Sequence, residues 1–253
     1  MALKVPAVLA LAGAVACGCG PFSLDAVSID PGSLAHDLVA HWAFDQTGGA
    51  AVADSSGYRR DGVLTGGSWV ADGAFGGALR LAAGDHVTVA GFPQATAGWT
   101  VSVWTRATAA DLAESATNDF APIISAETQF AGGWQINLDN RGMGQRFLAA
   151  YWAGGAASEY VRVFCSCVEP DRWIHLTAVW DGERAMVSLY RDAQKVGEAH
   201  MPSPISNSDT TLYLGAWNQP GRFFVGDLDD FAIWQRALQP VEIALLSHES
   251  PGS

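Results

Sequence analysis

Residues 226–236 read GDLDDFAIWQR, and this short stretch decides how the chain folds. Its apolar residues have the spacing of a strand that is buried on at least one face. Three acids crowd into four positions of the same strand: Asp227, Asp229 and Asp230. Burying a carboxylate without a partner is strongly unfavourable. These acids must therefore form a catalytic pair, hold a cation, or face water on the wet side of a half-buried sheet.

The same alternation of apolar and polar residues recurs along the chain and predicts an all-β protein. Strands are expected at 38–45, 86–92, 99–106, 147–152, 173–181, 184–192, 211–217 and 227–235. Clusters of Gly, Asp, Asn and Pro separate them, as in antiparallel sandwiches and barrels. Only 237–247 has a helical period, where Pro240 can open a short helix. We therefore expect one domain of two stacked antiparallel sheets with a short C-terminal helix.

Most tryptophans fall inside these strand patterns, which predicts that they are core residues. The six in question are Trp42, Trp99, Trp104, Trp173, Trp180 and Trp234. In the predicted strands 99–106 and 173–181, the residues on one face are apolar and those on the other are mixed. This pattern predicts a sheet with one core face and one half-wet face, which is partly exposed to solvent. His41 and His175 are expected to be packed or edge residues rather than ligands.

Composition narrows the range of partners. The 253 residues carry a formal net charge of −12, from 26 acidic and 14 basic side chains. Such a surface disfavours nucleic acid and anionic lipid as partners, and it permits cations and neutral ligands. Charged residues make up only 16% of the chain and glycines number 28, which fits short strands and turns better than surface helices.

The first sixteen residues, MALKVPAVLALAGAVA, predict export, because one Lys precedes an apolar run too short to span a bilayer. Cys17 stands where a bacterial lipoprotein signal places its lipidated cysteine, and Gly18 fits outer-membrane sorting, as carried over from known lipoproteins. Plain secretion and an anchor at Cys19 remain open. We expect a signal peptide over 1–16, a tether over 17–36, the domain over 37–248 and a tail over 249–253. The protein is then an outer-membrane or cell-surface lipoprotein, otherwise a secreted one, and touches a membrane only through its lipid.

Two further cysteines, Cys165 and Cys167, lie two apart in FCSCVEP. In an oxidising compartment a disulfide across one intervening residue is possible at a tight turn. Free thiols are the alternative. A metal site would need two more ligands, and His175 alone is weak support for one.

Five sequence blocks follow one another between 38 and 247. They are LVAHWAFDQTGG with VADSSGYRRDGVLTGG, then GAFGGALRLAAGDHVTV, WTVSVWTRAT, DRWIHLTAVWDGERAMVSLYRDAQKVGEA, and LYLGAW with FFVGDLDDFAIWQRALQPVEIALL. Together they resemble the laminin G-like, concanavalin A-like lectin/glucanase domains of bacterial surface proteins. The resemblance implies a jelly-roll sandwich that binds glycans or other surface partners rather than catalysing a reaction, often with a structural calcium. One departure is the hairpin turn, usually Asp-Gly but here Asp192-Ala193, where Ala193 must avoid positive φ or accept strain.

The resemblance also gives the acids candidate roles. Related glucanases carry Glu-x-Asp-x-Glu on one strand, and no such run occurs here; Asp227 and Asp229 share a face, but no Glu follows. The family pattern places a calcium ligand on Asp229, and pairing of the first and last strands would bring Asp45 and Asp54 beside it. We hypothesise a structural calcium held by these three. The alternative is that Asp54 caps the Ser-Ser-Gly turn while Asp45 and Asp229 accept backbone N–H groups.

Aromatic residues in loops, rather than in strands, are the candidates for stacking on a sugar. Trp217 with Asn218 and Arg222 supplies rings and polar groups across a Pro-Gly turn, and Tyr151 and Trp152 flank a second loop. We predict a non-catalytic, surface-tethered module that binds a glycan or an extracellular protein. The alternatives are a structural or adhesive component of an envelope complex without a sugar site, and a secreted glycoside hydrolase of the same fold.

Overall fold

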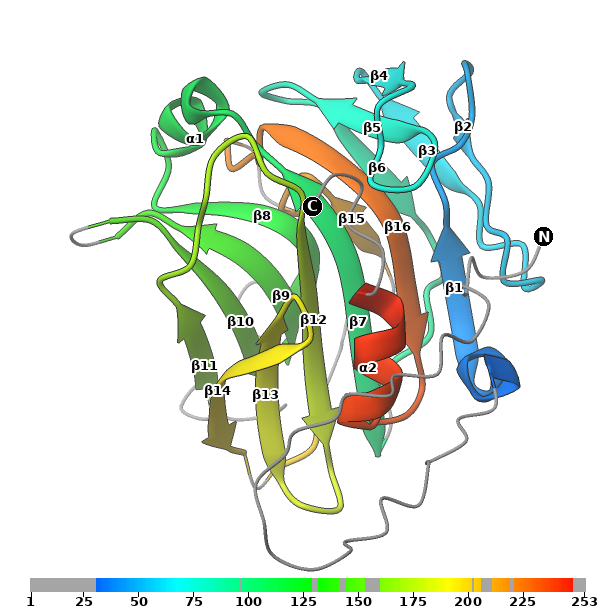
Figure 1. The fold of residues 1–253 in the computed structure, drawn as a ribbon, viewed down its shortest axis with the longest axis vertical. Helices are drawn as coiled ribbons and strands as arrows, with labels where there is room; N and C mark the ends of the chain where they lie inside the picture. Colours follow the sequence, from blue (N-terminus) through cyan, green and yellow to red (C-terminus); the bar gives the residue numbers. More distant parts are fainter. Residues whose placement is uncertain are drawn as a thin grey trace, which may run out of the picture.

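The computed structural model describes most of the chain from residue 31 onward (Figure 1). The described ranges are 31–95, 97–128, 132–141, 144–152, 160–201, 203–205, 211–218 and 221–247. The predicted signal peptide, Cys17, most of the predicted tether and the predicted tail lie outside these residues.

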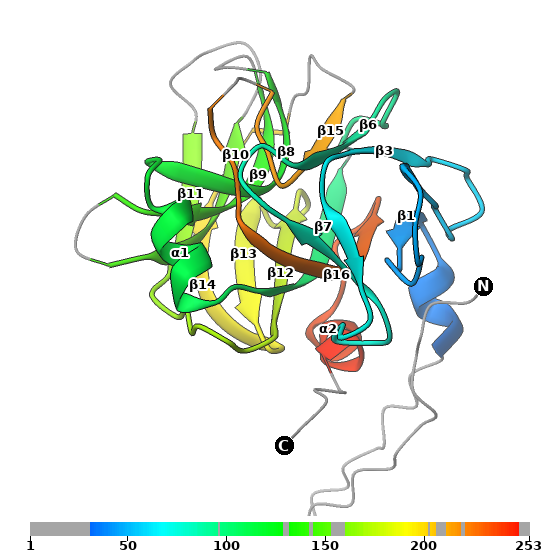
Figure 2. The same ribbon diagram turned by 90° about the horizontal axis from the view of Figure 1, so that it is seen from above.

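Two antiparallel sheets stack face to face in the described part of the chain (Figures 1 and 2). Sheet A has the order β14–β13–β12–β7–β16–β5–β4, with β1 also paired to β16. Its strands are Leu38–Trp42 (β1), Ser68–Val70 (β4), Ala78–Leu81 (β5), Gly98–Arg106 (β7), Ile174–Asp181 (β12), Met186–Arg191 (β13), Gln194–His200 (β14) and Gly226–Trp234 (β16).

Sheet B has the order β11–β10–β9–β8–β15–β6–β3–β2. Its strands are Ala51–Val52 (β2), Gly62–Thr65 (β3), His86–Val89 (β6), Phe120–Thr128 (β8), Gly132–Asp139 (β9), Arg146–Trp152 (β10), Tyr160–Cys165 (β11) and Leu212–Leu214 (β15). The predicted two-sheet, concanavalin A-like jelly-roll sandwich is confirmed.

The last strand, β16, organises sheet A because it pairs with β7 along one edge and with β5 and then β1 along the other. The pairing of the first strand with the last was predicted. The register with β7 shifts between Asp229 and Ala232, where Asp230 has a φ of 44°. An extra residue reverses the alternation of a strand. Phe231 and Ile233 therefore reach the core, while Trp234 packs on the outer face of sheet A.

All six of the predicted tryptophans are buried, but only Trp42, Trp99 and Trp180 lie in the core between the sheets; the other three pack on the outer face of sheet A. In β7, Trp99 and Val101 face sheet B. The opposite face of β7 is not half-wet as expected, because Thr100, Ser102 and Trp104 are buried as well. Covering segments explain the difference: Thr100 bonds the chain just before the last helix, and the ring of Phe75 lies edge-on over Trp104.

Helix α2 (Pro240–Ser247) forms where it was predicted, on the outer face of sheet A (Figure 1). Arg236 holds its first turn by pairing with Glu242 at 2.7 Å. Beside it lies a 3-10 helix, η1 (Pro31–Ala35), whose Leu34 carbonyl accepts the indole N–H of Trp234 at 2.7 Å. Residues assigned to the tether thus pack on the sandwich, which begins before residue 37.

Helix α1 (Ala109–Ser115) has no signal in the hydrophobic pattern, but it has one in its cap. Thr108 accepts the N–H of Asp111 at 3.1 Å, and Asp111 accepts the N–H of Thr108 at 2.8 Å. This reciprocal capping box stabilises a helix start. Neither helix in the described part of the chain is long and apolar enough to cross a membrane.

The β13–β14 hairpin accepts the strained turn that its sequence raised as one option. Asp192 and Ala193 have φ values of 48° and 62°, as both central residues of a type I′ turn must. Asp192 compensates with its side chain, which accepts the N–H of His175 at 3.0 Å. Tertiary contacts therefore hold an alanine in a conformation that usually belongs to glycine.

His175 of β12 is buried on the outer face of sheet A. Its Nε2 lies 2.7 Å from the Ser102 hydroxyl, and its ring packs 5.0 Å from that of Trp104. Burial lowers the pKa of His175 from 6.5 to about 4, and the nearby Asp230 carboxylate raises it only in part. The imidazole is therefore neutral in the folded protein at pH values where the unfolded chain would protonate it.

We expect His175 to make the protein less stable as the pH falls from 6.5 toward about 4. In this window the unfolded state binds a proton that the folded state excludes, so the free energy of unfolding falls by about 3 kcal/mol in total. Denaturant unfolding of wild type and His175→Gln at several pH values measures the slope, which should be flatter in the variant. His36→Gln, at a side chain that is 75% exposed, is the control. Equal slopes in wild type and His175→Gln would contradict this origin.

Candidate functional site

Asp227 of β16 is engaged by two arginines of neighbouring strands. Its carboxylate lies 2.9 Å from Arg106 Nε and 3.3 Å from Arg80 Nη1. Arg80 also pairs with Asp111 of α1, so the network joins β5, β7, β16 and α1. Such pairing compensates the burial of Asp227, which is 5% exposed. This carboxylate serves structure and is poorly placed to attack or protonate a glycosidic bond.

Asp229 and Asp230 turn toward different partners at the bulge. Asp229 is fully buried, and its oxygens accept the N–H groups of Phe75 and Asp230, both at 2.7 Å. Asp230 instead lies 2.6 Å from Nε2 of His41, whose Nδ1 lies 2.6 Å from the Ser55 hydroxyl. The imidazole therefore links the first strand to the last, in keeping with the predicted packed role of His41.

Asp54 caps the turn that follows β2, as the alternative to a calcium ligand predicted. One oxygen accepts the N–H groups of His41 at 3.0 Å and Ser56 at 2.8 Å. The other accepts the Ser56 hydroxyl and the N–H of Arg60, both at 2.8 Å. Burial alone would raise the pKa of this carboxyl, but the hydrogen bonds from His41, Arg60 and Ser56 together lower it. Four donors already occupy the carboxylate, which makes it a poor metal ligand.

Asp45 and Asp229 meet at one turn, 73–77, whereas Asp54 serves another. Asp45 accepts the N–H of Gly77 at 2.9 Å, and Asp229 accepts the N–H of Phe75, two residues earlier in the same turn. The turn is tight, because a Cβ placed on Gly73 would lie 2.1 Å from the Gly77 carbonyl oxygen. Among the described residues, no group of three or more His, Cys, Asp or Glu side chains is placed to hold a metal ion. The three predicted ligands thus do not form one cluster.

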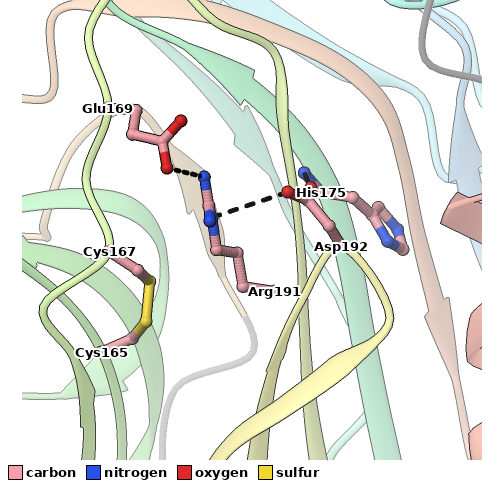
Figure 3. Close-up of a disulfide and its surroundings, with 6 residues drawn as sticks. All are labelled: Cys165, Cys167, Glu169, His175, Arg191 and Asp192. Atoms are coloured by element: carbon pink, nitrogen blue, oxygen red, sulfur yellow. Dashed lines mark hydrogen bonds and ion pairs between the residues drawn. A yellow bond between two sulfur atoms is a disulfide. The ribbon is translucent and has the colours of Figure 1, made fainter. Parts of the chain in front are cut away.

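Cys165 and Cys167 form a disulfide at the end of β11 (Figure 3). Just beyond it, Glu169 pairs with Arg191 of β13 and with Arg172. The latter guanidinium also bonds Asp192 of the strained hairpin at 3.0 Å. The disulfide closes the turn after β11, and the ion pairs that follow it tie this edge of sheet B to the β13–β14 edge of sheet A. His175, drawn beyond Asp192 in Figure 3, bonds Ser102 and does not join the sulfurs.

The outer face of sheet B presents polar side chains across neighbouring strands. Strand pairing sets Thr88, Tyr213, Ser125 and Gln135 in one row, which continues through the backbone of Ala150 to Arg162. Asn137 lies two residues after Gln135 in β9, and its Nδ2 donates to Gln135 Oε1 at 2.7 Å. The Ser125 hydroxyl and Asn137 Oδ1 are buried and have no hydrogen-bond partner among the described residues. Unpartnered buried groups cost stability, and they are enriched where a ligand completes the bonding.

At one end of this face, four partly exposed residues form what we call the arginine–aromatic corner: Phe120, Arg141, Trp217 and Arg222. The guanidinium carbon of Arg222 lies 4.6 Å from the ring centre of Trp217 and 5.5 Å from that of Phe120. That of Arg141 lies 3.9 Å from the Phe120 ring centre. Trp217 and Arg222 face each other across a hairpin, with a 3.4 Å hydrogen bond between their backbones. Trp217 Nε1 and Asn218 Oδ1 are buried and have no hydrogen-bond partner in the described part of the chain.

The structure thus brings Trp217, Asn218 and Arg222 together, as the sequence predicted. The other predicted binding pair, Tyr151 and Trp152, lies on β10, but their side chains and the loop 153–159 are outside the described residues. Phe120 and Arg141 were missed because no strands were predicted over 120–139. The alternation of Trp, Ile and Leu with Gln, Asn and Asp in WQINLD (134–139) is the signal that would have found β9.

Comparison with known proteins identifies the family. Residues 81–244, more than half of the chain, match the family described as the concanavalin A-like lectin/glucanases superfamily. The chain belongs to this superfamily. No curated protein sequence matches it.

Solved structures of similar fold include a domain of a sugar-degrading enzyme and the binding domains of two toxins. Domain 4 of AbnA, a GH43 extracellular arabinanase from Geobacillus stearothermophilus in complex with arabinotriose, has a TM-score of 0.64 and 19% identity over 84% of this chain and 98% of its own. The binding domain of Paraclostridial Mosquitocidal Protein 1 has a TM-score of 0.67 and 17% identity over 85% of this chain and 52% of its own. The botulinum neurotoxin serotype D ligand binding domain, in complex with N-acetylneuraminic acid, has a TM-score of 0.64 and 16% identity over 83% of this chain and 50% of its own. This superfamily member thus spans about half of each toxin domain, and at these identities the likeness shows the fold.

We expect Asp54→Ala to lower the free energy of unfolding by about 1–3 kcal/mol, because the N–H groups of His41, Ser56 and Arg60 lose their acceptor. Urea unfolding at neutral pH measures the change. Asp72→Ala is the control, since that side chain is 85% exposed and pairs only with Arg106; it should change stability by less than about 0.5 kcal/mol. Equal effects of the two substitutions would contradict the capping role of Asp54.

Proposed function

We propose that this chain is a non-catalytic binding module that holds a glycan at the arginine–aromatic corner of sheet B. Export and lipidation at Cys17, as the sequence predicts, would present this module at the cell surface. The observation that carries the proposal is the Trp217–Arg222 hairpin, which sets a partly exposed ring beside an arginine that has no carboxylate partner among the described residues.

The chemistry of the corner suits a sugar. Glycans are recognised by an aromatic face that packs on the ring and by a few polar groups that fix the hydroxyls. Phe120 and Trp217 supply partly exposed rings, and Arg222 beside them supplies N–H donors that no carboxylate of the described residues engages. Two solved relatives in fold hold arabinotriose and N-acetylneuraminic acid, which supports carbohydrate as the ligand class.

The acids of the chain favour binding over cleavage. A retaining glycosidase needs two carboxyl groups about 5–5.5 Å apart with access to the sugar. Asp227 is held by two arginines, and Asp229 is fully buried on backbone N–H groups. At the corner itself, Asp139 is fully buried and bonds Arg141 and Arg146. These carboxylates are occupied by structural bonds.

We expect Trp217→Ala to weaken glycan binding by about 10-fold or more, the effect of truncating an aromatic anchor. Affinity electrophoresis through gels that contain a panel of soluble polysaccharides measures the retardation. Tyr58→Ala is the control, because Tyr58 is an exposed ring remote from the corner and lies under Arg60. Equal retardation of Trp217→Ala and wild type would overturn the site. Release of reducing ends, abolished by Asp229→Asn, would favour a hydrolase, and indifference to every polysaccharide would favour an envelope scaffold.

We propose in addition that calcium binds at the turn 73–77, through Asp45 and Asp229. Both carboxylates hold this turn, and a divalent cation there would offset their mutual repulsion while drawing further oxygens from backbone carbonyls. Asp54 is left out because four donors surround it. The cation would link the end of β1 to β16 and so stabilise the junction of the first and last strands.

Millimolar calcium is expected to raise the thermal midpoint by several degrees, because a ligand that binds only the folded state stabilises it by mass action. Thermal scans with calcium and with a chelator measure the shift. The double variant Asp45→Asn/Asp229→Asn should lose the response, whereas Asp54→Asn should keep it from a lower starting midpoint. A midpoint that is the same with calcium and with chelator would remove the site.

A further inference from the structure

We propose that the arginine–aromatic corner takes an acidic sugar, and that the carboxylate of a uronic acid unit binds the guanidinium of Arg222. This inference rests on the proposed glycan-binding function and specifies its ligand class. The fold alone leaves the charge of the ligand open, since arabinotriose is neutral and N-acetylneuraminic acid is acidic. The discriminating feature must therefore be in the residues of this chain.

Arg222 differs from most arginines of the molecule in what surrounds it. Eight described arginines have a carboxylate within ion-pair distance: Arg80, Arg106, Arg141, Arg146, Arg172, Arg184, Arg191 and Arg236. Within the described residues, Arg222 has no carboxylate at that distance, and its guanidinium donates no hydrogen bond. Its contacts are the rings of Trp217 and Phe120.

Two rings position a guanidinium without neutralising it. A cation–π contact draws on the positive charge but supplies no acceptor oxygen, so the N–H groups of Arg222 keep their capacity to bond. The rings also restrict a long side chain that otherwise loses rotamer entropy when a ligand fixes it. Arg222 is therefore preorganised for an incoming anion, and a planar carboxylate matches the two parallel N–H donors of its fork.

Acids near the corner do not fill this role. Asp139 is fully buried and occupied by Arg141 at 3.1 Å and Arg146 at 2.9 Å. Asp119 precedes Phe120 and is exposed, and it forms no ion pair among the described residues. One buried carboxylate thus serves two arginines, and the charge of Arg222 remains uncompensated.

The partly exposed rings of the corner, Phe120 and Trp217, give the sugar ring its own contacts. An aromatic face packs on a sugar ring, and a few polar groups then fix its orientation. A uronic acid unit combines such a ring with the carboxylate that Arg222 would take.

The net charge of −12 opposes an acidic polymer and fixes the conditions of the test. At physiological salt the screening length is about 8 Å, so distant carboxylates are screened while a direct guanidinium–carboxylate contact persists. Binding should therefore be measured near physiological ionic strength, where low-salt repulsion does not mask it.

The test compares three acidic polymers with their carboxyl-reduced forms: polygalacturonate, alginate and glucuronan. Reduction replaces the carboxylate by a primary alcohol and leaves the ring stereochemistry unchanged. For at least one polymer, wild-type protein should bind the acidic form about 10- to 100-fold more tightly than the reduced form. Arg222→Ala and Arg222→Lys should both lose this preference, because Lys keeps the charge but not the fork. Arg184→Ala, at a side chain 73% exposed on the outer face of sheet A, should retain it, and thermal midpoints verify folding.

The outcomes separate this inference from the proposed function. Equal binding of acidic and reduced polymers, lost in Trp217→Ala, would overturn the uronate assignment and leave the glycan-binding function standing. Binding of dextran sulfate but of no polyuronate would likewise overturn it in favour of a sulfated ligand. Failure to bind any acidic, reduced or neutral polysaccharide would overturn both.

Discussion

The need to partner the buried acids of β16 shapes much of this domain. A central strand with three carboxylates in four positions is stable only when each finds a partner. Arg80 and Arg106 hold Asp227, the turn 73–77 holds Asp229, and His41 holds Asp230. Each of these contacts reaches a different part of the chain. The acids therefore fix how the first strand, the β4–β5 segment and α1 are arranged around β16.

This constraint separates the roles of the two outer faces. The outer face of sheet A is covered by α2, η1 and the turn 73–77 (Figure 1). The acids on this face form hydrogen bonds and ion pairs within the protein. On sheet B, the arginine–aromatic corner stays partly exposed, and its Arg222 has no carboxylate partner among the described residues. A surface that must recognise something needs unused bonding capacity. Sheet B retains this capacity at the corner, whereas the covered part of sheet A presents little of it to a ligand.

Local sequence patterns predicted the strands whose alternation is regular and failed where tertiary structure intervenes. β7, β12 and β16 were readable because apolar residues recur at every second position. The bulge at Asp230 could not be predicted from the sequence, because an extra residue leaves the local composition unchanged. Only the register with β7 reveals it. The half-wet face expected for β7 was wrong because the segment before α2 and the turn 73–77, which lie outside this strand in sequence, cover it. The split of the three calcium candidates likewise depends on how two turns fold around β1, which no local pattern encodes.

The two ways in which this chain holds arginines on sheet B have different electrostatic results. Arg141 and Arg146 share the buried Asp139, so part of their charge is cancelled within the protein. Arg222 is held by rings, which restrict its side chain but leave its charge in place. The protein has a net charge of −12, so the electrostatic potential over most of its surface is expected to be negative. Arg222 places a positive charge on this surface that no described carboxylate cancels. Specificity for an anion can arise from such a single fixed charge, because screening removes the distant repulsion before it removes a direct contact.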